Sequence, residues 1–153
     1  MKYLNFFRKE VPEMLAGLSE EMKPTFGLMT PQHMVEHLIW VTKSSIKDMG
    51  PAPAELSKRE LGFKKFINSG ANFEYRPSDK TEKDLPALKY ESLEEAISKV
   101  GEAIDRLENG IKEKSDGQSF YNPMMGKLNT EEMEFFHFRH FEWHLKKQFE
   151  LGK

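Results

Sequence analysis

The chain has 153 residues, 38% of them hydrophobic and 31% charged, which predicts one soluble domain over residues 1–153 with a sizeable core. A formal net charge of −2, with no apolar run near the roughly 18 residues that cross a bilayer, argues against nucleic acid and membrane as partners. The lack of cysteine excludes disulfides, thiolate metal ligands and a cysteine nucleophile, and fits a cytoplasmic location.

The first half of the chain predicts two helices. Charges within the first ten residues argue against a signal peptide, and the first helix is expected over about 10–22 (EVPEMLAGLSEEM), before the Lys23–Pro24 step. The second begins at Thr30, a good N-cap, with Pro31 at the first helical position. It should run to about Asp48, before the GPAP sequence at 50–53.

The second half predicts two more helices. One begins at Ser92, where SLEE (92–95) has the form of a capping box, and ends near the Asn109–Gly110 pair. The last begins after Asn129 or Thr130 and runs nearly to the end of the chain.

About forty residues, 50–91, separate the second and third helices, and they hold one short helical piece near 58–68 and otherwise little regular structure. A connection of that length can return along the molecule, so these two helices could be parallel. The fold class expected from the residues is all-α, a four-helix bundle with this long crossover.

Histidine is concentrated in two short stretches, PQHMVEHLIW (31–40) and FFHFRHFEWHL (135–145), which contain all five. At 100° per residue, His140 and His144 fall within about 60° of His137 on a helical wheel. The charged residues of the last helix fall on its opposite side. The three imidazoles therefore share a face that points away from solvent.

A metal ion is one way to satisfy several buried imidazoles. Histidines at positions i and i+4 of a helix, as His140 and His144 are, can bind one ion from the same side. His37, on the second helix, can supply the third ligand of a site that keeps one position open. Hydrogen-bonded core histidines would produce the same spacing, and the residues alone leave both readings open.

Two protease-like patterns are weaker. Residues 33–37 (HMVEH) match H-x-x-E-H, but the pattern fixes only three positions and Glu36 falls beside lysines on a solvated face. Residues 140–144 (HFEWH) resemble H-E-x-x-H with the glutamate one place late, so Glu142 is no evident general base. Gln148, one turn beyond His144, could orient a ligand or simply pack.

The segments MTPQHMVEHL (29–38) and NPMMGKLNTEEMEFFHFRHFEWHLKKQF (122–149) resemble the DinB/YfiT-like metalloenzyme superfamily, and its branch that ends in H-x-x-x-H-L-x-x-Q-F. The resemblance covers most of the chain in layout and is moderately specific only in these two segments. It implies an up-down-down-up four-helix bundle with a divalent metal held by three histidines. By position these are His37, His140 and His144, which leaves His33 and His137 as candidates for a supporting role around the metal.

The resemblance further implies zinc or nickel, with iron and manganese as further candidates, and a low-molecular-weight thiol as a cofactor. We therefore expect a metal-dependent transferase or hydrolase that activates a thiol or water for a small-molecule substrate. Neither that substrate nor any catalytic side chain can be named from the sequence. The alternative is a non-catalytic helical binding or dimerisation module, a homodimer for example, with a degenerate metal site.

Overall fold

The computed structural model describes residues 1–114 and 117–152, and it is mainly helical with one two-stranded antiparallel sheet. The α-helices are α1 (Val11–Ala16), α2 (Pro31–Ser45), α3 (Lys58–Ser69), α4 (Leu93–Ser98), α5 (Val100–Lys112) and α6 (Thr130–Glu142). Two π-helical segments, η1 (Phe6–Glu10) and η3 (Trp143–Gln148), and one 3₁₀ turn, η2 (Glu82–Asp84), complete the helical structure. The strands are β1 (Ser119–Asn122) and β2 (Gly126–Asn129).

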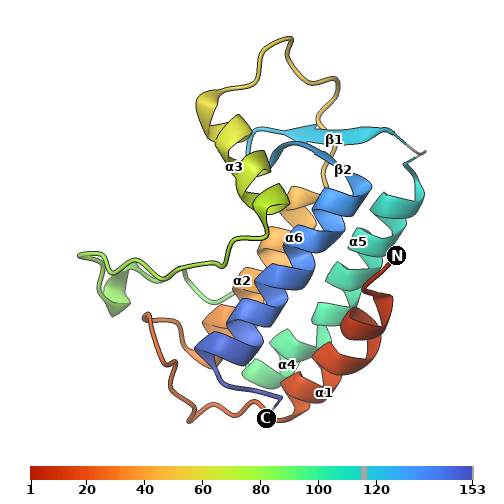
Figure 1. Ribbon diagram of the computed structural model, residues 1–153. Coiled ribbons are helices and arrows are strands. Elements are labelled where there is room, and N and C mark those ends of the chain that lie inside the picture. Colours follow the sequence, from red (N-terminus) through yellow and green to blue (C-terminus); the bar gives the residue numbers. More distant parts are fainter. Residues whose placement is uncertain (115–116, 153) are drawn as a thin grey trace.

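Four helical segments lie side by side around one core (Figure 1). In that view α2 and the pair α4–α5 run upward, whereas η1–α1 and α6–η3 run downward. The helices α2 and α4–α5 therefore run parallel, as the length of the crossover between them allowed. The core between them is apolar, with fully buried side chains that include Phe7, Leu38, Leu107, Phe141 and Leu145. Within the described ranges, no helix is long and apolar enough to cross a membrane.

The first helix begins earlier and ends earlier than predicted. It starts with η1, whose Phe6 and Phe7 are buried, and stops at Ala16 instead of near residue 22. Pro12 lies inside it and not at its start: a proline cannot donate to the carbonyl four residues back, and the preceding turn is π-helical. Gly17, a poor helix former, ends it.

The second helix starts as predicted, with the Thr30 hydroxyl accepting a hydrogen bond from the His33 amide and Pro31 in the first turn. It ends at Ser45 instead of Asp48 because another part of the chain caps it. The buried Asn122 amide donates to the carbonyls of Ser45 and Lys47, each at 2.9 Å. That cap depends on a contact across 77 positions, which local sequence patterns do not reveal.

Asn122 belongs to the hairpin β1–β2, which was not predicted. Its strands have only four residues each and show no extended alternation of polar and apolar side chains. The hairpin loop closes through the Asn122 side chain, which accepts from the Met125 amide, and through Gly126 at a φ of 73°. A Cβ on Gly126 would lie 3.1 Å from that of Glu60, so α3 packs directly on the hairpin.

The third predicted helix is divided and longer than expected. Ser92 caps α4 by accepting from the Glu95 amide, while the Glu95 carboxylate accepts from the Glu91 amide, so the predicted box is only half formed. The helix then turns at Lys99 and continues as α5 to Lys112, past the expected end at Asn109–Gly110. Gly110 is a packing glycine: a Cβ there would lie 2.4 Å from the Ile46 side chain.

The last helix begins where it was expected. Asn129 is its N-cap, and Glu132 completes a capping box by accepting from the Asn129 amide. The short helix predicted near 58–68 is α3, and η2 is the only other helical piece in the described crossover, 50–91.

Candidate metal centre

The three histidines predicted as ligands converge in the interior. His37 comes from the middle of α2, His140 from the last turn of α6, and His144 from η3. The Nε2 atom of His140 lies 3.2 Å from Nε2 of His37 and 3.1 Å from Nε2 of His144. One ligand nitrogen from each ring lies within 4.8 Å of the other two. The predicted convergence of two distant segments is confirmed.

The spacing of these nitrogens fits a shared cation. A tetrahedral zinc ion bound about 2.0–2.1 Å from each imidazole holds the nitrogens about 3.3 Å apart. The three ring centroids are separated by 4.7 to 5.1 Å, so the rings are grouped around a common point. The cluster of His37, His140 and His144 could therefore hold a metal ion.

The hydrogen-bond pattern points the same way. The Gln148 amide nitrogen donates to the Phe26 carbonyl, which directs its Oε1 toward Nδ1 of His144 at 2.7 Å. Since Oε1 only accepts, Nδ1 of His144 carries the proton, and in a neutral ring its Nε2 presents a lone pair to His140. Gln148 thus orients the ring, the first of the two roles that its position allowed.

Protons cannot satisfy the cluster by themselves. His140 Nε2 faces two other Nε2 atoms, yet a neutral ring has at most one hydrogen there to share between them. If its hydrogen lies on Nδ1 instead, lone pairs face one another, and Nδ1 is buried without a partner in the described part of the chain. A cation that accepts all three Nε2 lone pairs removes the repulsion between them, and it leaves the N–H at Nδ1 of His140 without a partner in the described residues.

Burial keeps the imidazoles neutral and ready to ligate. Desolvation lowers the pKa of His144 to about 4 and lowers the pKa of His37. The pKa of His140 is lowered well below 6.5, first by desolvation and then by the charges that its neighbours His144 and His37 would carry. At neutral pH these rings are lone-pair donors, as a metal ligand must be.

Aromatic side chains surround the cluster. The ring of Phe136 stacks on His140 at 5.3 Å with an interplanar angle of 16°, and Trp143 packs edge-on against His144 at 4.9 Å. The ring centroid of Phe26, from the loop after α1, lies 4.8 Å from that of Trp143 and 5.3 Å from that of Tyr75 in the crossover. Phe26 and Tyr75 were not predicted as part of this site, because the segments that carry them have no periodicity.

The loop that carries Phe26 is tied to the end of η3. The Thr25 amide donates to the Gln148 carbonyl, and its hydroxyl donates to the Lys147 carbonyl, both at 2.8 Å. Carbonyls at a helix end lack intrahelical donors, and Thr25 supplies them here. This contact fixes the backbone of Gln148, and through its side chain the ring of His144.

The remaining histidines lie outside the cluster. His33 bonds to the Thr30 hydroxyl and to the Pro86 carbonyl, at 2.7 and 3.0 Å, and so holds the crossover against α2. His137 is fully buried and bonds to the Ser45 hydroxyl at 2.6 Å, and burial lowers its pKa to about 3. Ser45 was not anticipated as its partner.

The two glutamates of the protease-like patterns do not face the histidine cluster as bases. Glu36 accepts hydrogen bonds from the backbone amides of Lys89 and Tyr90 in the crossover. Glu142 pairs with Lys146 at 3.7 Å on the outer side of the helix. Neither geometry supports a zinc-protease arrangement.

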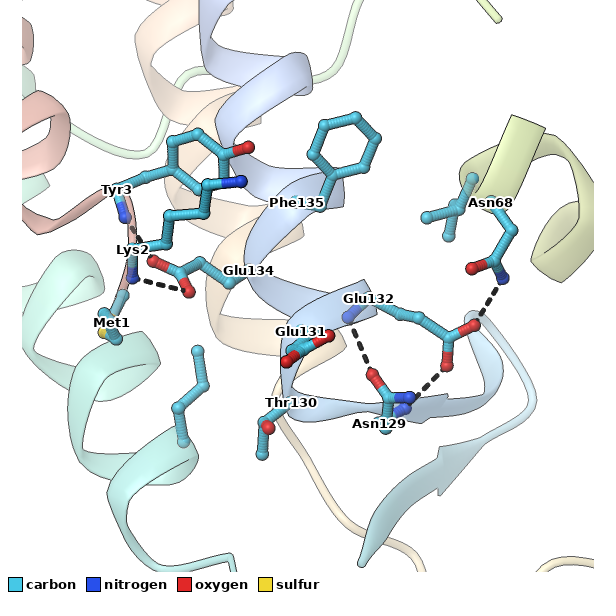
Figure 2. A pocket seen from close by; sticks show the side chains of 12 residues that line it. Met1, Lys2, Tyr3, Asn68, Asn129, Thr130, Glu131, Glu132, Glu134 and Phe135 are labelled. Atoms are coloured by element: carbon cyan, nitrogen blue, oxygen red, sulfur yellow. Dashed lines mark hydrogen bonds between the residues drawn. The ribbon is translucent and has the colours of Figure 1, made fainter. Parts of the chain in front are cut away.

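Two cavities of similar size lie beside the histidine-bearing helices, one along α2 and one at the start of α6. The first, here called the α2 cavity, has a volume of about 590 Å³ and is lined by His37 together with Trp40, Lys43, Lys47, Lys89 and Arg106. The second, called the α6 N-terminal cavity, measures about 580 Å³ and lies between the first residues of the chain and the start of α6 (Figure 2). Only the first is lined by a member of the histidine cluster.

Figure 2 shows that two acidic side chains of the α6 N-terminal cavity are bound within the protein. Glu134 accepts from the backbone amides of Lys2 and Tyr3 at 3.1 and 2.6 Å. Glu132 accepts from the Asn129 amide and from the side chain of Asn68. These carboxylates join the N-terminal segment and α3 to α6.

Comparison of the chain with models of known protein families, with curated proteins and with solved structures found no match. The resemblance to the DinB/YfiT-like superfamily therefore stays a prediction. Any functional assignment has to come from the geometry of the histidine cluster and its surroundings.

Proposed function

We propose that this protein is a DinB-like metalloenzyme in which His37, His140 and His144 hold one divalent ion, zinc or nickel, for a transferase or hydrolase reaction on a small molecule. The observation that carries the proposal is the meeting of three neutral imidazole nitrogens, 3.1 and 3.2 Å apart along two sides, with too few protons to satisfy them. Imidazole ligands suit zinc, nickel and iron alike.

The arrangement of the helices supports the family part of the proposal. The directions of η1–α1, α2, α4–α5 and α6–η3 are those of an up-down-down-up four-helix bundle (Figure 1). Two ligands come from the last helical segment and one from α2, which are the positions that the resemblance implies.

The side chains have separate tasks in this scheme. A bound divalent ion would supply Lewis acidity, which lowers the pKa of a thiol or a water in its open position. Gln148 holds His144 in the required tautomer through its bond to Nδ1. Phe136 and Trp143 exclude water from one side of the cluster, which strengthens every electrostatic interaction in it.

Metal analysis tests the first half of the proposal. Protein purified without a histidine tag is expected to contain close to one divalent ion per chain, because all three ligands come from one chain. His144→Ala should abolish this content, while the matched control His33→Ala, whose ring bonds to Thr30 and Pro86, should retain it. Metal that is lost in His33→Ala and kept in His144→Ala would contradict the ligand assignment.

A reaction screen tests the second half. Metal-loaded protein should catalyse the reaction of electrophilic small molecules with a low-molecular-weight thiol, or their hydrolysis, and the His144→Ala variant should not. Gln148→Leu should retain a reduced rate, since it changes the orientation of a ligand and not the number of ligands. Metal-loaded protein that catalyses neither thiol transfer to these electrophiles nor their hydrolysis would contradict an enzymatic role.

A second candidate is a non-catalytic helical module in which the histidine cluster is degenerate. The observation that favours it is Nδ1 of His140, which is buried without a hydrogen-bond partner in the described ranges. Histidine ligands almost always donate this N–H to a carboxylate, a carbonyl or water. This candidate predicts metal-free protein and an unchanged unfolding temperature on addition of zinc or nickel.

A further inference from the structure

The metal proposal makes no use of the α2 cavity, although His37 is part of its lining. The cavity lies along α2, with Arg106 of α5 on one side and crossover residues 85–90 on the other. A volume of about 590 Å³ is within the range of pockets that take a small organic ligand.

The crossover is fixed against α2 by hydrogen bonds. Glu36 accepts from the Lys89 and Tyr90 amides at 2.6 and 3.2 Å, and the His33 ring contacts the Pro86 carbonyl at 3.0 Å. Gln32 adds a bond to the Tyr90 carbonyl at 2.8 Å. These bonds hold the wall of the cavity in place, which lowers the entropic cost of binding a ligand.

The charges around this cavity are strongly unbalanced. The chain as a whole carries −2, yet four cationic side chains line the cavity: Lys43, Lys47, Lys89 and Arg106. The one lining carboxylate, Glu36, is already bound by backbone amides and by the Gln32 side chain. The local field therefore favours an anion.

Most of this positive charge is unpaired. Lys43 lies 3.9 Å from Glu102, at the limit of an ion pair, and Lys89 lies 5.4 Å from the centre of the Tyr90 ring. Among the residues that the structure describes, Lys47 and Arg106 form no ion pair. Two cations, Lys47 just beyond the end of α2 and Arg106 on α5, are thus free to contact a ligand.

Most of the remaining residues of the cavity wall are apolar, and the polar ones among them are His33, His37 and Ser44. Trp40, 61% exposed, stands at its edge, and the buried Ile39 and half-buried Tyr90 are also part of its lining. These walls suit a ligand with an apolar or aromatic body.

His37 connects this cavity to the histidine cluster. Its ring lines the cavity, while its Nε2 faces His140 from 3.2 Å. His37 is half-buried, whereas His140 and His144 are buried. The cluster is therefore reached from the cavity at His37.

We propose that the α2 cavity binds the substrate, and that the substrate is a small organic anion with an apolar body, its charge held by Lys47 and Arg106. The role as substrate rests on the function proposed above. The binding of an organic anion does not, since no metal ligand other than His37 lines the cavity.

Two fluorescent probes test the proposal on the intact chain. One is 1-anilinonaphthalene-8-sulfonate, an aromatic anion, and the other is N-phenyl-1-naphthylamine, which has the same aromatic body without the sulfonate. The anion should bind at least about fivefold more tightly than the neutral probe, as one or two half-solvated charge contacts allow. Equal affinity for the two probes would overturn the proposal.

Variants locate the charge contacts. Lys47→Gln and Arg106→Gln should each weaken anion binding about three- to fivefold, and the double variant about tenfold or more, with the neutral probe unaffected. The control Lys65→Gln removes one positive charge from the exposed face of α3, outside the cavity, and should change neither probe. If Lys65→Gln weakens anion binding as much as the cavity variants do, the site is not in this cavity.

One further arm separates this proposal from the metal proposal. His144→Ala should lose metal and keep its affinity for the sulfonate probe within about twofold, because His144 does not line the cavity. The double variant at Lys47 and Arg106 should keep its metal. Wild-type protein that contains no metal but still prefers the anion would overturn the proposed function and leave the anion site intact.

Discussion

The two ends of α6 each bury a group of polar side chains, and they satisfy them in opposite ways. At the N-terminal end, both oxygens of Glu134 accept backbone N–H groups, and both oxygens of Glu132 have donors from Asn129, Lys64 or Asn68. At the C-terminal end, imidazole nitrogens that cannot all donate face one another. The first group stabilises the fold, and the second opposes it.

This difference separates a structural site from a functional one. A buried polar group that has its hydrogen-bond partners contributes about 1 kcal/mol to stability, whereas a buried polar group without a partner costs about 1–3 kcal/mol. Fully satisfied carboxylates need no ligand to explain them. Unsatisfied imidazoles that face one another do need a ligand to explain them, because folding alone gains no stability from placing them together.

The largest difference between the two ends is expected on adding metal. Zinc at a free concentration a thousandfold above its Kd should stabilise the protein by about 4 kcal/mol, because it binds only the folded cluster. His144→Ala should abolish this gain, and Glu134→Gln should retain it from a lower baseline. Thermal unfolding with and without zinc measures both, and an equal gain in His144→Ala would contradict the assignment of the C-terminal end.

The two ends should also respond to different ranges of pH in metal-free protein. Burial lowers the pKa of His144 from 6.5 to about 4, so the stability linked to its neutral form is complete above pH 6.5 and is lost as pH falls toward 4. Between pH 7 and pH 5 the loss from this ring alone is about 2 kcal/mol.

Glu132, at the other end of α6, should contribute no change of stability between pH 7 and pH 5. For Glu132, desolvation raises the pKa, but hydrogen bonds from Asn129, Lys64 and Asn68 outweigh it, so the pKa lies below 4.5. Its contribution is present above pH 4.5 and is lost only below. Urea unfolding at pH 7, 6 and 5 should show a free energy of unfolding that falls with pH. His144→Phe should reduce this dependence on pH, and Glu132→Gln should leave it unchanged. A free energy of unfolding that does not change with pH in the wild-type protein would contradict the prediction.

Removing a partner from the satisfied end should cost stability without affecting metal. Glu132→Ala leaves the Asn129 amide and the Lys64 and Asn68 side chains without their acceptor, and should lower the free energy of unfolding by about 2 kcal/mol. The exposed neighbour Glu131 is the matched control, and Glu131→Ala should cost less than about 0.5 kcal/mol. Equal costs in urea denaturation would show that burial and capping at Glu132 contribute nothing.

A smaller effect is expected from Gln148, which connects the cluster to the Phe26 loop. Gln148→Leu removes the acceptor for Nδ1 of His144, and should weaken zinc affinity about tenfold, or about 1.4 kcal/mol. Competition with a chelating indicator measures this, with Lys147→Gln on the exposed side as the control. Unchanged affinity in Gln148→Leu would mean that the ring orientation is set by packing against Trp143 alone.

Local signals in the sequence were enough for the elements that carry the cluster. Thr30 and Asn129 cap α2 and α6 through side-chain bonds three residues ahead, so both helix starts were predictable. His140 and His144 are four residues apart, and residues at that spacing lie on one face of a helix. His37 was expected to join them only as a possible third ligand on the second helix and by the resemblance, since no local signal in the sequence brings the two helices together.

The features that were missed depend on contacts far apart along the chain. Asn122 ends α2 from a hairpin, Gly110 allows α5 to approach Ile46, and Phe26 covers Trp143 from an irregular loop. The first helix was expected to begin near residue 10, yet it begins earlier because Phe6 and Phe7 are buried in the core. The α2 cavity is likewise formed by residues from α2, α5 and the crossover, which no single window of sequence brings together.

The central claim is that three imidazoles of one chain share one ion, and X-ray absorption at the metal edge of untagged, metal-loaded protein tests it most directly. If the metal is zinc, we expect three nitrogen neighbours with imidazole scattering about 2.0–2.1 Å from it. In His144→Ala we expect two such nitrogen neighbours if any metal remains. A shell made of oxygen alone, or an imidazole shell that persists unchanged in His144→Ala, would contradict it.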